Sequence, residues 1–400
     1  MFRLSNLKKF TKENWCYLSC EFSVTGIKNP FEEKTMWVAV EEKNGDMLAG
    51  NVYDPFVLVP VILGMYYKQD VHIDGSVSPR LYHNVQYYLM NIFDRFSDHT
   101  SPIQFTVNGF DTVEQVGSLI GTGISCGVDS LVTIYDNFIN ETDPSFKINS
   151  LFFVNCGTHG DFEDEASHKK FRDRVALNRT GAEELGLPMY LVNSNYHAFT
   201  HKIGEQKIGY LAIYSCVLSL QRYIRRYYTS SNLSYDEIAE FTKLSRDLDI
   251  AEYSESFMSH LISTENFELV VDGCQYTRAE KLERISEWSF AQKHLNVCIP
   301  TVDNGHNCSC CDKCIGTLIP LEAMGKLDQF KEVFDLDVYR RHAFMGKCKF
   351  LAGYEHYGMD PVLTSIIKYA KERGMHLPPK WIARILWFGY RCLRKLGVAK

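Results

Sequence analysis

The sequence contains no long hydrophobic run. Its longest apolar stretch, Phe56 to Met65, contains Pro60 and is too short to span a bilayer as a helix. The N-terminal residues, Met1 to Phe10, lack the apolar core that a secretory signal peptide requires. These absences argue against a transmembrane helix and an export signal, and we expect a cytoplasmic protein.

An excess of positive charge is also absent. The 400 residues include 43 Lys and Arg against 49 Asp and Glu, which gives a formal net charge of −6. This balance does not support a surface that coats nucleic acid, although a local basic patch stays open. A hydrophobic content of 45% is ordinary for a globular chain, and the length allows two or three domains.

Cysteine, by contrast, is plentiful, with 13 residues. Without an export signal, so many cysteines favour free thiols and metal ligation over disulfides.

The stretch from Gly121 to Leu131 is rich in glycine and serine and lies between an apolar strand pattern and a helical one. Two common phosphate signatures do not fit it. A Walker A loop needs Lys where Val128 follows Gly127, and a dinucleotide fingerprint needs glycine where Cys126 stands. A strand-to-helix turn of this composition can still bind an anion at the helix N-terminus. The alternative is a Ser/Gly turn that only leads into a core helix.

The segment Ser125 to Ser130 reads Ser-Cys-Gly-Val-Asp-Ser. It resembles the S-G-G-x-D-S loop of the PP-loop ATP pyrophosphatase superfamily, whose members hold the pyrophosphate of ATP while they adenylate a carbonyl or carboxyl oxygen. Cys126 departs from the glycine of that pattern, and because it has a Cβ we expect it to avoid positive φ. The resemblance assigns nucleotide contacts to Ser125, Cys126, Gly127, Val128, Asp129 and Ser130.

A second cysteine-rich motif follows downstream. Cys308, Cys311 and Cys314 form C-x2-C-x2-C, and Cys298 precedes them. Four thiolates suit one tetrahedral Zn²⁺, although an iron–sulfur cluster could use the same ligands. The set is very similar to the zinc cluster of 7-cyano-7-deazaguanine synthase-like PP-loop proteins, with a first gap one residue longer. Cys310 is surplus and could replace Cys308 or Cys311 as a ligand.

Between the two motifs, Thr277 to Lys281 predicts a helix start. Thr277 is a suitable N-cap and Glu280 completes a capping box. The segment resembles the Asp-Lys-Ala-Glu element of the same proteins, which implies that Arg278 stands near the phosphates. The other interpretation is a capped helix with a solvated arginine.

The alternation of strand and helix patterns from Val116 to Asn193 predicts an α/β fold with a parallel sheet and right-handed crossovers. We expect an N-terminal α+β domain at 1–112, a PP-loop domain of the adenine nucleotide alpha hydrolase kind with the zinc site at 113–318, and a C-terminal helical region at 319–400. In the first part, Asn44-Gly45 predicts a hairpin turn before a strand at Met47 to Val52.

The tail from Lys380 to Lys400 is basic and aromatic and contains no acidic residue. It could lie on a membrane or on RNA, but a terminal helix docked through its apolar face is the simpler expectation.

The resemblance implies an ATP-dependent, AMP-forming ligase that uses Mg²⁺. It would adenylate a small molecule, a deazapurine or another base being one candidate, and displace AMP with ammonia or a similar nucleophile. Asp129 would help to place Mg²⁺, Ser130 would hold pyrophosphate and Arg278 would offset phosphate charge. Two alternatives stay open: a sulfur transferase that carries sulfur on Cys126 or Cys156, and a nucleotide-binding module without catalysis.

Overall fold

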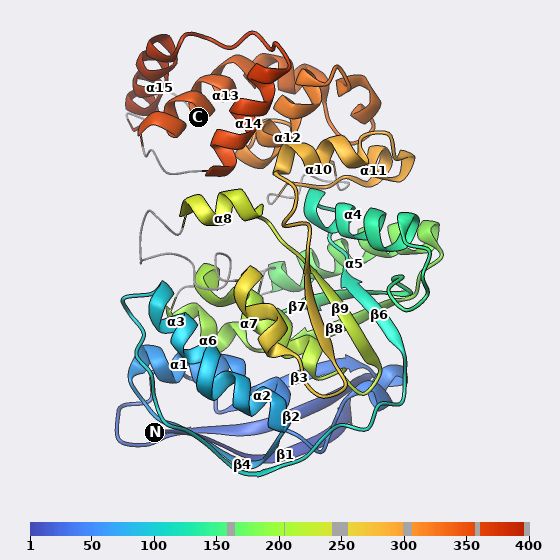
Figure 1. Ribbon diagram of the computed structural model, residues 1–400, viewed down its shortest axis with the longest axis vertical. Coiled ribbons are helices and arrows are strands. Elements are labelled where there is room, and N and C mark those ends of the chain that lie inside the picture. The colour runs from blue at the N-terminus through green and yellow to red at the C-terminus, as the bar shows by residue number, and fades with distance from the viewer. Residues whose placement is uncertain (158–164, 204, 242–254, 299–305, 357–360, 396–400) are drawn as a thin grey trace. The chain divides into compact units, whose positions relative to one another are not determined.

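The computed structural model describes residues 1–157, 165–203, 205–241, 255–298, 306–356 and 361–395 (Figure 1). By its internal contacts the chain forms two compact units. The sheet unit comprises Met1–Ile124, Asp136–Ser231 and Ser245–Asp272. The helical unit comprises Ser125–Tyr135, Asn232–Leu244 and Gly273–Lys400.

The sheet unit is built on one ten-stranded sheet in the order β10-β9-β6-β7-β8-β3-β2-β1-β4-β5. All neighbouring strands are parallel except β1/β2, β2/β3 and β3/β8. This confirms the α/β class and a mostly parallel sheet. The strands are β1 (Phe2–Lys12), β2 (Trp15–Val24), β3 (Thr35–Glu41), β4 (Val71–Val77), β5 (Phe105–Phe110), β6 (Leu119–Gly123), β7 (Ser150–Asn155), β8 (Met189–Ser194), β9 (Ile224–Ser230) and β10 (Glu268–Asp272).

The strands of residues 1–112 join the same sheet as the later strands. The junction is the antiparallel pair β3/β8, in which Val38 lies opposite Ser194 and Val40 opposite Val192. One hydrophobic core also runs through the unit, from Phe2 to Leu269. The division into three domains stays a prediction, because shared contacts do not test which parts fold alone.

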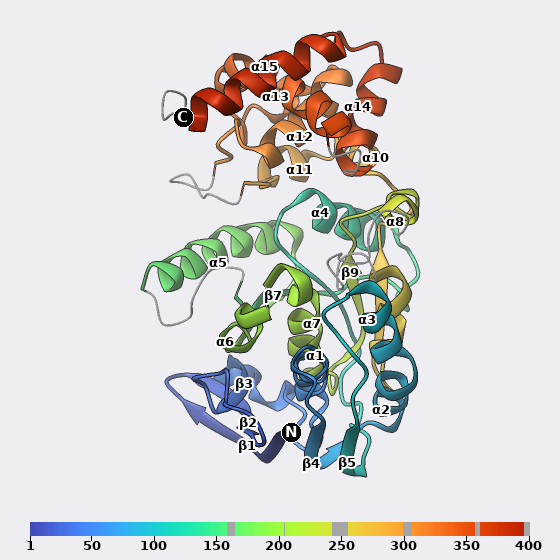
Figure 2. The same ribbon diagram turned by 90° about the vertical axis from the view of Figure 1, so that its left-hand side faces the viewer.

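Helices cover the sheet, as the two ribbon views show (Figures 1 and 2). Helix α7 contacts β7 and β8, α1 contacts β4, and the two helices contact each other. Helix α1 is apolar on all sides, and a helix of this kind is stable only when it is buried. Its eight consecutive residues from Leu58 to Met65 are all buried. The helices of this unit are α1 (Leu58–Tyr67), α2 (Pro79–Asn84), α3 (Met90–Phe96), α5 (Glu165–Leu185), α6 (His197–Thr200) and α7 (Glu205–Leu218).

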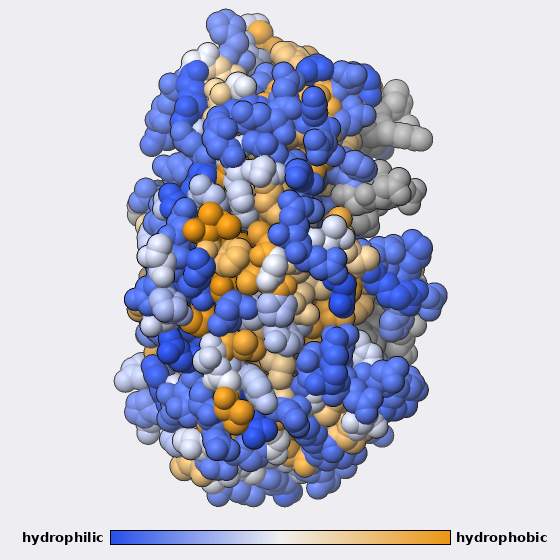
Figure 3. Space-filling view, turned by 90° about the vertical axis from the view of Figure 1, so that its right-hand side faces the viewer, coloured by the Kyte–Doolittle hydropathy of each residue, from blue (hydrophilic) through white to orange (hydrophobic). Residues whose placement is uncertain are grey.

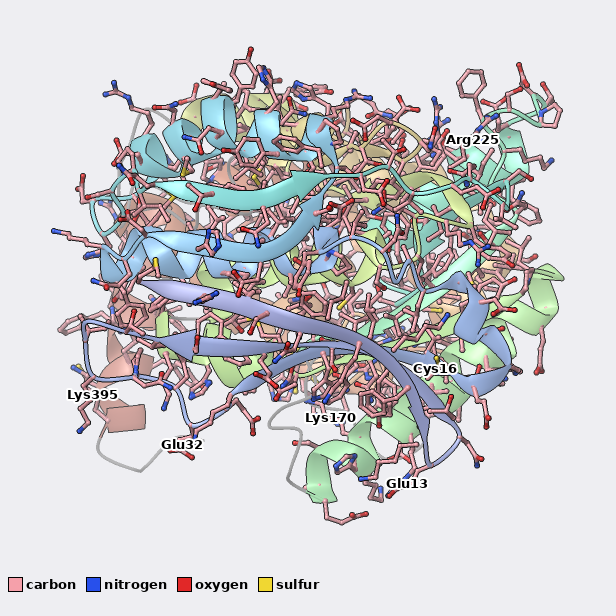
Figure 4. All side chains as sticks on the ribbon, turned by 90° about the horizontal axis from the view of Figure 1, so that it is seen from below. Glu13, Cys16, Glu32, Lys170, Arg225 and Lys395 are labelled. Carbon is pink, nitrogen blue, oxygen red and sulfur yellow. The ribbon has the colours of Figure 1, made fainter. Side chains whose placement is uncertain are left out.

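The hairpin between β1 and β2 turns at Glu13 and Asn14, and Figure 4 shows Glu13 at its tip. Both residues have positive φ, 51° and 65°, as a two-residue type I′ turn requires. The prediction of a hairpin at Asn44-Gly45 is wrong. A short 3₁₀ helix (η1, Glu42–Met47) stands there, with the Gly45 Cα packed against Cys16, and Met47 to Val52 forms no strand.

The helical unit holds the Ser125–Ser130 loop and the cysteine motif. Helix α10 packs against α4, α12 and α14, and α13 packs against α12, α14 and α15. The helix predicted to start at Thr277 is confirmed, and several helices occupy residues 319–395, where a helical region was expected. The helices of the helical unit are α4 (Val128–Ile134), α8 (Tyr235–Phe241), α10 (Arg278–Ile285), α11 (Ser289–His294), α12 (Asp312–Ala323), α13 (Leu336–His356), α14 (Pro361–Glu372) and α15 (Lys380–Lys395).

On the face drawn in Figure 3, hydrophilic residues cover most of the surface and apolar residues gather in patches. Among the helices that the structure describes, none is long and apolar enough to cross a membrane.

Candidate nucleotide loop and metal centre

The loop after β6 has the backbone of a glycine at the position of Cys126. Its φ is +54°, and its side chain is 1% exposed. The expectation that a residue with a Cβ avoids positive φ here is therefore wrong: the chain accepts the left-handed conformation and buries the thiol. A residue with a Cβ in this conformation carries a strain cost of about 1 kcal/mol.

Because of this strain, we expect glycine and alanine variants at position 126 to have the reverse of their usual order of stability. At position 126 we expect Cys126→Gly to be more stable than Cys126→Ala by about 1 kcal/mol, because only glycine relaxes a positive φ. Cys216 is the matched control, since it is a buried cysteine inside helix α7. There the alanine variant should be the more stable by about 1 kcal/mol. Urea unfolding of the four variants measures these differences. A more stable alanine variant at both positions would contradict the strain assigned to Cys126.

The two serines of the loop face each other across it. Ser125 Oγ lies 3.1 Å from Ser130 Oγ and accepts a hydrogen bond from the Gly127 N–H at 3.3 Å. Ser130 Oγ donates to the Gly127 carbonyl at 3.3 Å. Gly127 is the N-cap of α4, with φ −75° and ψ 167°. The predicted loop residues thus form one compact turn.

Asp129 is held by two cations. Its Oδ1 lies 2.9 Å from Lys281 Nζ and its Oδ2 lies 3.3 Å from Arg278 NH1. The side chain of Lys281 is 1% exposed, that of Arg278 12% and that of Asp129 21%. Burial alone would raise the pKa of the Asp129 carboxyl, but Lys281 and Arg278 outweigh it and the pKa is lowered. Asp129 is therefore a half-buried, paired carboxylate, and we expect its removal to affect the fold as well as the loop.

Helix α10 brings both cations to Asp129. The predicted capping box is confirmed: the Thr277 hydroxyl accepts from the Glu280 N–H, and Glu280 Oε2 accepts from the Thr277 N–H at 2.8 Å. Arg278 and Lys281 are three residues apart, so they lie on the same side of the helix. The role of Lys281 was not predicted. Its only signal was that spacing from Arg278, together with its place beside the buried Ala279 and Leu282.

The donor set around Asp129 suits a phosphate group better than a bare divalent ion. Within the described parts of the chain, no group of three or more His, Asp or Glu side chains converges here. Magnesium in nucleotide sites is usually held by one or two carboxylates and by phosphate oxygens. Asp129 fits that role only with phosphate present, when Lys281 and Arg278 can share the phosphate charge.

The four predicted zinc ligands converge on one point. The ligand atoms of Cys298, Cys308, Cys311 and Cys314 all lie within 4.8 Å of one another. Sulfur pairs are 3.9 Å apart for 298/311, 3.8 Å for 308/314 and 3.5 Å for 311/314. A tetrahedron with Zn–S bonds of about 2.3 Å has sulfur–sulfur edges of about 3.8 Å. The set therefore fits a structural zinc ion, and exposed Cys310 lies outside it.

A tight turn places three of these sulfurs. The Cys311 N–H donates to Cys308 Sγ at 3.3 Å, and Ser309 between them has φ +59°. Cys311 is the N-cap of α12, so Cys314 lies in the first turn of that helix. Hydrogen bonding with Cys314 lowers the pKa of Cys311 to about 5, whereas burial raises the pKa of Cys298 to about 12. Metal ligation requires thiolates, so a bound ion would displace protons from these cysteines.

Asn307 joins the two halves of the cysteine motif. Its Oδ1 accepts from the N–H groups of Val297 and Cys298 at 2.8 and 3.1 Å. Its Nδ2 donates to the carbonyls of Leu295 and Val333 at 2.8 and 3.0 Å. The residue is 4% exposed and all four of its hydrogen bonds are made. This role was not predicted, because an asparagine beside a cysteine carries no metal signal.

We expect Asn307→Ala to lower the free energy of unfolding by about 3 kcal/mol, because it leaves buried backbone groups without partners at about 1–3 kcal/mol each. Zinc affinity should fall about 10- to 100-fold, as it does when an outer contact of a metal ligand is lost. The control is Asn91→Ala, an exposed residue with one hydrogen bond to the Tyr87 carbonyl. Equal effects of the two substitutions, measured by urea unfolding and competition with a chelator, would contradict this role.

The loop and the metal motif contact each other within the helical unit. The Asn296 N–H donates to the Cys126 carbonyl at 2.7 Å, two residues before Cys298. The structure therefore brings Ser125, Asp129 and Arg278 together and links them to the four cysteines through the backbone. Comparison with family models, curated proteins and solved structures found no match.

Proposed function

We propose that the chain is an ATP-dependent, AMP-forming enzyme of the PP-loop kind, similar to 7-cyano-7-deazaguanine synthase-like proteins. A carboxyl or carbonyl oxygen of a small molecule, a deazapurine or another base being the first candidate, attacks the α-phosphorus of ATP. Pyrophosphate leaves, and ammonia or a similar nucleophile then displaces AMP from the adenylate.

The observation that carries this proposal is the cation pair beside the loop. Lys281 and Arg278 converge on Asp129, and Cys126 in the loop has a positive φ of the kind that is usual for glycine. Fixed cations next to a compact serine turn favour the charge that develops on a departing pyrophosphate. Ser125 and Ser130 would hold that group through their hydroxyls, and bound Mg²⁺ would supply further neutralisation of the phosphate charge.

The sulfur-transfer alternative receives less support from the geometry. A carrier thiol must reach its substrate as a thiolate. Cys126 is 1% exposed and Cys156 is 3% exposed, so neither thiol is accessible to a substrate as the chain is folded. The four converging cysteines also suit a closed structural site, which leaves no coordination position for chemistry.

Pyrophosphate release from ATP tests the proposal. The purified chain is assayed with Mg²⁺, ammonium and a panel of carboxylic acids that includes deazapurine carboxylic acids. Release that depends on both an acid and ATP is the expected result. ATP binding without release, under conditions in which nucleotide protects the loop from proteolysis, would favour the non-catalytic module. Retained amidation in Cys126→Ala and Cys156→Ala would exclude sulfur transfer.

A further inference from the structure

Helix α15 (Lys380–Lys395) has two apolar faces, and the described residues of the helical unit cover only one of them. It packs along α13, where Ala383 is fully buried and Lys349 Nζ lies 5.3 Å from the centre of the Trp387 ring. The two helices run side by side in both ribbon views (Figures 1 and 2). The docked helix expected from the sequence is therefore present, but docking uses only part of its apolar surface.

The second face is an exposed apolar row. Trp381, Ile385 and Phe388 are 65%, 63% and 70% exposed, and exposed Cys392 continues their spacing. Residues spaced by four, three and four positions lie above one another on a helix. Over these positions the row is roughly 17 Å long. Large side chains at such exposure in one continuous row are typical of an interaction surface.

A basic row runs beside it. Lys380, Arg384, Arg391 and Lys395 are spaced by four, seven and four positions, so they share a neighbouring strip of the same helix. Lys395 is labelled at the end of the helix in Figure 4. The sequence from Lys380 to Lys400 contains no acidic residue, although the whole chain has a net charge of −6. Positive charge is thus concentrated where the apolar row is exposed.

We propose that this face of α15 docks on an anionic lipid surface. An apolar row that inserts among acyl chains and an adjoining basic row that meets negatively charged headgroups are the two requirements of an interfacial helix. Tryptophan and phenylalanine suit the depth of that interface. The helix then lies in the plane of the membrane, while the rest of the chain stays in the aqueous phase.

Two other partners fit the row less well. A second copy of the chain would bring two basic rows together. The area of one such row is also small compared with the roughly 1,200 Å² that a stable interface buries. Single-stranded RNA would stack its bases on aromatic rings, but Ile385 has no ring and stands between the two aromatic residues.

The test is cosedimentation of the full chain with vesicles of phosphatidylglycerol mixed with phosphatidylcholine, and with vesicles of phosphatidylcholine alone. We expect binding to the first that weakens with salt, and at least tenfold weaker binding to the second. Ile385→Ser with Phe388→Ser should lower partitioning about 30-fold or more through lost apolar burial. Arg384→Gln with Arg391→Gln should lower it about 30-fold on the anionic vesicles.

Matched controls are exposed residues of the sheet unit. Tyr87→Ser with Phe110→Ser removes side chains that are 59% and 56% exposed, and Lys169→Gln with Arg172→Gln removes two exposed charges. Both pairs should bind as the unaltered chain does. The Trp381 emission should also shift to the blue on binding, and Trp381→Phe should remove that shift.

Three results would overturn the proposal: equal loss in the controls, binding to RNA but not to vesicles, or a self-association that Ile385→Ser with Phe388→Ser abolishes.

Discussion

The purified protein is expected to contain one zinc ion per chain, and Cys311→Ser is expected to lose it together with much of the stability of the helical unit. Structural zinc has an apparent binding free energy of roughly 10–16 kcal/mol in zinc-finger peptides, and this energy is also folding energy. Loss of the metal should therefore lower stability by more than about 3 kcal/mol. Elemental analysis and thermal unfolding, with and without a chelator, measure both effects.

Cys310→Ser is the control for this experiment, because Cys310 lies next to Cys311 but is exposed and outside the cluster. It should keep both the metal and the melting temperature. Iron with inorganic sulfide, no metal at all, or full zinc content in Cys311→Ser would contradict the assignment. Acidification should release the metal, since protons compete with it for the thiolates.

A second large effect is expected at the ion pair of the loop. Under the proposed function, Asp129→Asn should lower pyrophosphate release by at least about 100-fold, because Lys281 and Arg278, whose charge would favour the leaving group, lose their orienting partner. It should also cost up to about 3 kcal/mol of stability, since the almost fully buried Lys281 is left without its carboxylate. This loss of stability is at the lower end of the range for breaking a buried ion pair, because the Asp129 side chain is 21% exposed.

A double variant separates these two effects. Asp129→Asn with Lys281→Met removes the carboxylate and the more buried of its two cations, and it leaves Arg278, whose side chain is 12% exposed. Replacing a buried pair with uncharged groups is often neutral for stability. We expect the double variant to unfold near the unaltered chain and still to lack activity. Circular dichroism in urea and the pyrophosphate assay measure the two outcomes. Arg284→Gln, on the exposed face of the same helix, should leave both unchanged.

A double variant that regains turnover with its stability would show that Asp129 serves only the fold. The PP-loop interpretation of the residues Ser125 to Ser130 would then lose its main support.

Features that depend on residues close together in the sequence could be predicted, and those that depend on residues far apart could not. The capping box at Thr277 and Glu280 and the spacing of the last three cysteines are local patterns, and the structure has both. Lys281 was missed because its partner Asp129 is 152 residues away. No periodicity distinguishes a lysine that is paired deep in the protein from one in solvent.

Local signals also failed where packing decides the conformation. Asn44-Gly45 favours a hairpin by composition, but Gly45 is needed there for its close approach to Cys16, where an added Cβ would lie 3.0 Å from the sulfur. Cys126 shows the reverse case, a residue with a Cβ in a conformation that favours glycine. Burial of the thiol offsets a strain that propensity alone would forbid.

The β3/β8 pair has a consequence for synthesis of the chain. Strands β1 to β5 can pair among themselves once residue 110 has been made, but β3 then has one edge without a partner until β8 (Met189–Ser194) leaves the ribosome. At about 5–20 residues per second, the roughly 150 residues between β3 and β8 take about 8–30 s. During that interval Met36, Val38 and Val40, all buried in the finished sheet, border an open edge of the kind that templates aggregation. The nascent chain should therefore depend on chaperones most strongly between these two points of its synthesis.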